Sequence, residues 1–165
     1  MTAGRVCAIH QPNLFPRLST LAKLSAADVW VVLDDVQFNS RDYQHRMRLA
    51  PPSQPTAAVW LTLPVHRPRG RASLIREMTL AEPGSSARRL RHLAQQLFGR
   101  SPHWSEAADL LEVVAPLAQP GSQLVDVTEA STTAMLRALD GRDRSCVAAR
   151  SPCDPAAPNG WPTWQ

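Results

Sequence analysis

The sequence has no uninterrupted apolar run of about 20 residues, the length that a helix needs to cross a bilayer. The stretch Met1–Phe15 also lacks the apolar centre of a secretory signal, because His10 and Gln11 interrupt it. We therefore expect no membrane insertion and place the protein in the cytoplasm.

Cysteine and lysine are scarce as well. The three cysteines, at positions 7, 146 and 153, form no Cys-x-x-Cys pair, which agrees with a reducing compartment and provides no zinc motif. Lys23 is the only lysine, so the net charge of +4 comes almost wholly from arginine. A basic surface attracts phosphorylated partners. Because the charge is dispersed and no nucleic-acid-binding motif is present, RNA, including aminoacyl-tRNA, ranks below a small anionic molecule as the partner.

A chain of 165 residues is long enough for one domain. Its N-terminal part predicts a βαβ unit with a strand at Val6–Ile9, a helix at Leu18–Ala27 and a second strand at Val29–Leu33. Ser19 or Thr20 is the expected helix cap. The second strand is almost continuously apolar, which is typical of a strand covered on both faces of a mostly parallel sheet.

The chain then changes from strands to helices. Alternating apolar residues predict a strand at Ala58–Val65, and a weaker strand pattern covers Leu74–Leu80. Helical spacing follows at Ser85–Phe98, Ser105–Ala115 and Val125–Leu139. The predicted fold class is α/β, in which the βαβ unit and its mostly parallel sheet are followed by a helical C-terminal half.

Residues 141–165 follow none of these patterns, and they include four prolines and two of the five tryptophans. We interpret residues 1–140 as a domain shortened at its C-terminus, and residues 141–165 as an irregular, non-native or disordered tail. The shift toward Arg, Pro, Cys and Trp indicates a change of reading frame near Arg144. In that case the helix Val125–Leu139 would expose a face meant to be buried.

Polar residues follow each of the first two predicted strands, namely His10, Gln11, Asn13, Asp34, Asp35 and Gln37. If the strands are parallel neighbours, both groups leave from the edge where open α/β sheets bind ligands. We assign His10 as a general base or phosphate contact, and Asp34 and Asp35 as acid–base or metal-binding carboxylates. The alternative is that these residues form turns and satisfy the local backbone.

The basic segment Arg41–Arg48 is the second candidate. On a helix its spacing would place four side chains near one face: Arg41, Gln44, His45 and Arg48. Arginine forks suit phosphate and carboxylate groups, whereas the alternative is a solvated surface helix. The side chains expected to bind substrate are Gln11, Asn13, Gln37, Arg41, Gln44, Arg46, Arg48 and His66.

Four runs of the sequence resemble the WbqC-like family in order and spacing: Ala8–Asn13, Ala27–Phe38, Arg41–Arg48 and Trp60–Val65. The resemblance is close over about the first 70 residues and looser over Leu90–Leu139. It implies a bacterial protein of surface polysaccharide or secondary-metabolite biosynthesis, in a family whose reaction is not settled.

The leading expectation is a transferase or ligase-like enzyme that acts on an anionic or nucleotide-activated substrate. A looser similarity to nucleotidyl-transferring enzymes of the pantothenate synthetase type suggests adenylation, although those enzymes use two histidines and only His10 is a candidate here. The competing hypotheses are a non-catalytic protein that binds a nucleotide-sugar or a partner protein, and an inactive truncated remnant. The sequence identifies neither a cofactor nor a metal.

Overall fold

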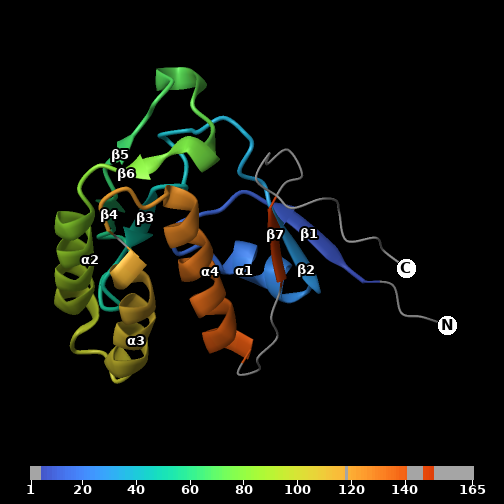
Figure 1. The fold of residues 1–165 in the computed structure, drawn as a ribbon. Helices are drawn as coiled ribbons and strands as arrows, with labels where there is room; N and C mark the ends of the chain where they lie inside the picture. The colour runs from blue at the N-terminus through green and yellow to red at the C-terminus, as the bar shows by residue number, and fades with distance from the viewer. Residues whose placement is uncertain (1–4, 118, 141–146, 151–165) are drawn as a thin grey trace.

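The main sheet consists of three parallel strands and lies at one side of the molecule (Figure 1). In this computed structural model, which describes residues 5–117, 119–140 and 147–150, the strand order is β1-β2-β7. The strands are β1 (Cys7–His10), β2 (Val29–Val32) and β7 (Val147–Arg150), and α1 (Leu18–Ser25) connects the first two. The predicted βαβ unit and parallel sheet are confirmed.

The central strand β2 is buried at all four residues, as its apolar sequence predicts. Its Trp30 indole Nε1 donates a hydrogen bond of 3.0 Å to the carbonyl oxygen of His10 at the end of β1. The start of α1 differs from the prediction. The helix begins after Arg17, whose carbonyl accepts from the N–H of Thr20 and Leu21, so the expected Ser19 or Thr20 cap is wrong.

The helical C-terminal half is confirmed, with α2 (Pro83–Phe98), α3 (Trp104–Val114) and α4 (Leu124–Asp140) close to their predicted bounds. Helix α4 contacts both α1 and α3, so it lies between the main sheet and the α2–α3 pair (Figure 1). No helix in the described part of the chain is long and apolar enough to span a membrane.

Helix α4 buries most of its apolar side chains, whereas Leu139 near its end is 56% exposed. Leu124, Val125, Val127 and Leu136 all belong to the core. Helices α1 and α3 both pack on α4. The exposed face was expected only for a change of reading frame near Arg144, which lies outside the described residues.

Strand β7 lies inside the tail that was expected to be irregular. Its backbone pairs in parallel with β2, from Val29 opposite Val147 to Val32 opposite Arg150. The rest of the tail, including the expected frame change near Arg144, lies outside the described residues.

Two short antiparallel pairs accompany the sheet, and both differ from the predicted strands. The run Ala58–Val65 divides into β4 (Val59–Thr62) and β5 (Val65–His66) at Pro64, which has no N–H to donate to a ladder. Strand β4 pairs with β3 (Arg46–Leu49).

The second pair joins β5 to β6 (Thr79–Leu80). Most of the predicted strand Leu74–Leu80 is wrong, because the 3₁₀ turn η2 (Ile75–Glu77) occupies its middle. Glu77 accepts a hydrogen bond from the N–H of Leu74, which favours this turn over an extended chain.

The segment Arg41–Arg48 is not helical, so the shared face that helical spacing would create does not form. Asn39 Oδ1 accepts from the N–H of Arg41 at 2.9 Å, and Asp42 Oδ1 accepts from the N–H of Tyr43 at 2.7 Å. These side chains offer the backbone a partner that competes with helical hydrogen bonds, so the segment turns and enters β3.

Candidate functional site

The loops after β1 and β2 leave from the same edge of the main sheet, as predicted. The two strands are parallel neighbours, and His10 lies opposite Val32 in their register. The N–H of Leu33 donates to the carbonyl oxygen of His10 at 3.1 Å, which ties the start of the second loop to the end of the first strand. The polar residues of both loops therefore begin at the ligand-binding edge of an open α/β sheet.

An amide network connects the first loop to the turn before β3. Gln11 Nε2 donates to Asp42 Oδ2 at 2.7 Å and to Asn13 Oδ1 at 3.4 Å. Gln44 Nε2 donates to Gln11 Oε1 at 3.1 Å, and the N–H of Asn39 donates to Gln44 Oε1 at 2.8 Å. Three predicted substrate-binding side chains, Gln11, Asn13 and Gln44, thus meet, and in this structure their amides hold one another in place.

Helix α4 anchors the same loop from far along the chain. Phe15 has a left-handed backbone with φ 45°, a conformation that is costly for a residue with a side chain. Its N–H donates to Ser131 Oγ at 3.1 Å, and Thr132 Oγ1 donates to the carbonyl oxygen of Asn13 at 3.4 Å. The loop after β1 is therefore held at its backbone by two hydroxyl groups.

The three predicted catalytic side chains lie at the end of β1 and in the loop after β2. His10 is half-buried, and its Nδ1 lies 2.7 Å from the carbonyl oxygen of Gln11. Because a carbonyl only accepts, Nδ1 carries the proton and Nε2 keeps the lone pair of the neutral ring. Asp34 is buried and Asp35 half-buried. No group of three metal-ligating side chains occurs in the portion of the protein that the structure describes.

The arginines of the Arg41–Arg48 segment do not share a face. Arg46 Nε donates to the carbonyl oxygen of Asp42 at 3.1 Å, and its guanidinium lies 4.3 Å from the centre of the Trp60 ring. Arg41 and Arg48 are exposed and line two different clefts. His66 is exposed in β5, with its backbone paired to Thr79.

A basic cleft of about 710 Å³ lies beyond the carboxyl end of β2. It is lined by Gln37, Phe38, Asn39, Ser40, Arg41, Arg67 and Arg71, with no Asp or Glu among them. The Arg67 guanidinium lies 4.9 Å from the centre of the Phe38 ring, and Gln37 Nε2 donates to the carbonyl oxygen of Arg71 at 2.5 Å. Gln37 and Arg41 were predicted, whereas Arg67 and Arg71 were missed. Their signal in the sequence is the basic loop Arg67–Arg71.

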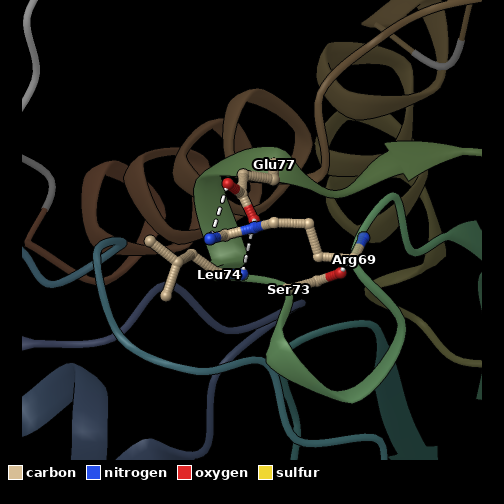
Figure 2. A network of polar contacts seen from close by, with 4 residues as sticks. All are labelled: Arg69, Ser73, Leu74 and Glu77. Carbon is tan, nitrogen blue, oxygen red and sulfur yellow. Dashed lines mark hydrogen bonds and ion pairs between the residues drawn. The ribbon is translucent and has the colours of Figure 1, made fainter.

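The loop that carries Arg71 is held by one carboxylate, as Figure 2 shows. Glu77 accepts from Arg69 through both oxygens, at 3.0 Å from Nε and 2.7 Å from Nη2. It also accepts from the N–H of Leu74 at 2.8 Å, and the N–H of Arg69 donates to the buried hydroxyl of Ser73 at 2.9 Å. The Leu74 hydrogen bond first, and then Arg69, hold the pKa of Glu77 below its usual range. The carboxylate therefore stays charged and holds the two ends of the loop, at Arg69 and Leu74, together.

A neutral histidine packs against Phe38, one of the residues that line the basic cleft. His45 is buried, and its ring lies at 66° to the Phe38 ring, with 5.0 Å between the ring centres. Burial above all, and then the charges of Arg46 and Arg67, lower the pKa of His45 to about 4. Its Nδ1 has no hydrogen-bond partner among the described residues. At neutral pH His45 therefore adds no charge next to Phe38.

The model of the WbqC-like protein family matches residues 11–150, from the residue after β1 to the end of β7. The chain belongs to the WbqC-like protein family. The match includes every residue of the basic cleft of this WbqC-like chain. No curated protein and no solved structure matches the chain.

Proposed function

We propose that this WbqC-like protein is a transferase or ligase-like enzyme of surface polysaccharide or secondary-metabolite biosynthesis that binds an anionic or nucleotide-activated substrate in the basic cleft. The observation that carries the proposal is the cleft itself. Three arginines line about 710 Å³, partly on the segment that follows β2, and no carboxylate among the lining residues neutralises them. Guanidinium groups bind phosphate through paired hydrogen bonds, so a phosphorylated group suits this surface.

The catalytic roles proposed for the adjoining loops follow from their chemistry. His10 presents Nε2 as a basic nitrogen, since Nδ1 is committed to the carbonyl of Gln11. Asp34 and Asp35 stand three residues or fewer before Gln37, the first residue of the basic cleft. In the proposal they act as acid–base groups or hold a divalent cation beside the bound phosphate.

The binding half of the proposal is tested by calorimetric titration of a panel of nucleotide-sugars, acyl-adenylates and aminoacyl-tRNA. Arg41→Gln and Arg71→Gln should each lower the affinity for the best ligand about tenfold or more, which is the contribution of a hydrogen bond between charged groups. Arg89→Gln on the exposed side of α2 is the matched control and should bind like the parent protein. Unchanged affinity in both cleft variants would show that the ligand binds elsewhere.

The catalytic half is tested by incubating the bound ligand with candidate acceptors and following products by mass spectrometry. His10→Gln and Asp35→Asn should lose turnover while retaining most of the ligand affinity. If the parent protein binds a nucleotide-sugar and converts nothing, the competing non-catalytic binding function is favoured. If no member of the panel binds at all, the result favours an inactive remnant.

A further inference from the structure

A second cleft, of about 690 Å³, borders the same stretch of chain as the basic cleft but has an apolar lining. Residues 37–41 line the basic cleft, whereas Tyr43 and residues 47–50 line this apolar cleft. We propose that the apolar cleft binds an amphipathic anion, with its hydrocarbon chain inside and its carboxylate or phosphate at Arg17 and Arg48. This site is separate from the proposed substrate site.

Most of the side chains that line the apolar cleft are hydrocarbon, and α2, α3, α4 and β3 all contribute to its walls. Leu90, Ala94 and Phe98 recur every fourth residue along α2 and so face the cleft from one side of that helix. Leu110 of α3, Met135 of α4 and Leu49 of β3 also line the cleft. Such a volume lies within the range of pockets that bind small molecules, and its walls offer little to a sugar or a nucleotide.

The opening of the apolar cleft is cationic. Arg17 and Arg48 are both exposed, both line the cleft, and no Asp or Glu is among the lining residues. The Arg17 guanidinium lies 4.0 Å from the centre of the Tyr43 ring and also donates to the Tyr43 hydroxyl. Its remaining N–H groups can bind an anion, because a guanidinium has five donors.

The combination of walls and opening selects the ligand class. A neutral hydrocarbon would leave two guanidinium groups without an anionic partner, and an inorganic anion would leave the apolar walls exposed. Leu18, which follows Arg17 and also lines the cleft, is 72% exposed and offers apolar contact to a hydrocarbon chain that leaves the cleft. A single-chain carboxylate or phosphate satisfies both features.

The first experiment measures binding of the full chain to octanoate, decanoate, dodecanoate and dodecyl phosphate by displacement of a fluorescent fatty acid. Each added methylene should tighten binding about fourfold until the cleft is filled. Dodecanol should bind more weakly than dodecanoate or dodecyl phosphate. Tighter binding of either anion supports the proposal and identifies the head group.

Variants separate the chain site from the head-group site. Ala107→Leu fills part of the cleft from α3 and should lower the affinity for every ligand. Ala108→Leu, at the neighbouring residue outside the cleft, should leave these affinities unchanged. The double variant Arg17→Gln, Arg48→Gln should lower the affinity for the two anions about tenfold or more and leave the affinity for dodecanol unchanged. Thermal unfolding of each variant confirms that it is folded.

Three results would overturn the proposal. These are dodecanol binding as tightly as dodecanoate, an equal effect of Ala107→Leu and Ala108→Leu, and binding to anionic vesicles with no binding of the monomeric amphiphiles. A dimer that Ala107→Leu dissociates would instead assign the cleft to a second copy of the chain. Arg41→Gln and Arg71→Gln should not change any of these affinities, so failure here is distinguishable from failure of the basic cleft.

Discussion

His45 gives the protein a defined response to acid. In the unfolded chain its pKa is the ordinary histidine value of 6.5, whereas burial lowers the pKa of His45 to about 4 in the folded protein. Between these pH values the unfolded state holds more protons. The contribution of His45 to the unfolding free energy is therefore fully present above pH 6.5 and is lost as the pH falls toward 4. The gap between the two pKa values corresponds to about 3 kcal/mol of unfolding free energy.

We expect His45→Gln to remove this contribution to the pH dependence. Urea unfolding of the parent protein and the variant at several pH values between 7 and 4 measures it. His66→Gln, which changes an exposed histidine, is the matched control and should keep the parent slope. Parallel curves for the parent and His45→Gln would contradict the assignment.

Ser131 is the second residue whose substitution should change the unfolding free energy measurably. Its hydroxyl accepts from the N–H of Phe15 and donates to the carbonyl oxygen of Thr128 at 2.9 Å. Ser131→Ala leaves the Phe15 N–H without that partner, and such a loss costs about 1–3 kcal/mol. Chemical denaturation should show this loss for Ser131→Ala and a smaller one for Thr133→Ala on the same helix. Equal losses would mean that the anchor contributes little.

At the scale of elements, the loop that carries Arg71 depends on Glu77. Glu77→Gln removes the negative charge that accepts hydrogen bonds from both Arg69 and the N–H of Leu74. The loop should then open more often, and the cleft should bind anions several times more weakly. Hydrogen exchange at Leu74 should become faster. Glu112→Gln breaks an exposed ion pair with Arg91 on the α2–α3 pair and serves as the control. Unchanged exchange at Leu74 in Glu77→Gln would contradict this role.

The long helices could be predicted from the sequence because their apolar period is local. The bounds predicted for α2, α3 and α4 differ from the observed ones by two residues or fewer. The conformation of Arg41–Arg48 could not be predicted in this way. Its helical spacing is overridden by pairing with β4 and by backbone hydrogen bonds to the side chains of Asn39 and Asp42.

The candidate site was predictable only in part for a similar reason. Parallel pairing of β1 and β2 brings the loops after His10 and Val32 to one edge, which the topology implied. Arg67 and Arg71 arrive there through the fold of the loop that Glu77 closes, and no local pattern indicates that closure.

At the scale of the whole molecule, the two clefts should respond differently to salt. The net charge is +4, and the basic cleft holds three arginines on a polar surface. Raising the ionic strength from about 0.05 M to about 0.5 M shortens the screening length about threefold. Binding of a nucleotide-sugar should weaken several times, while the affinity gained per methylene in the apolar cleft should not change. Titrations at both ionic strengths measure this, and equal salt dependence of the two quantities would contradict it.

The anchor between Phe15 and Ser131 also determines when the protein acquires its site during synthesis. The two residues are 116 positions apart, and a ribosome that adds about 5–20 residues per second needs roughly 6–23 seconds to cover that distance. Strand β2 waits still longer for β7, so a nascent chain carries an unpaired strand edge in the meantime. The loop after β1 is thus made early and fixed late, and an incomplete chain is exposed to aggregation before it can bind a ligand.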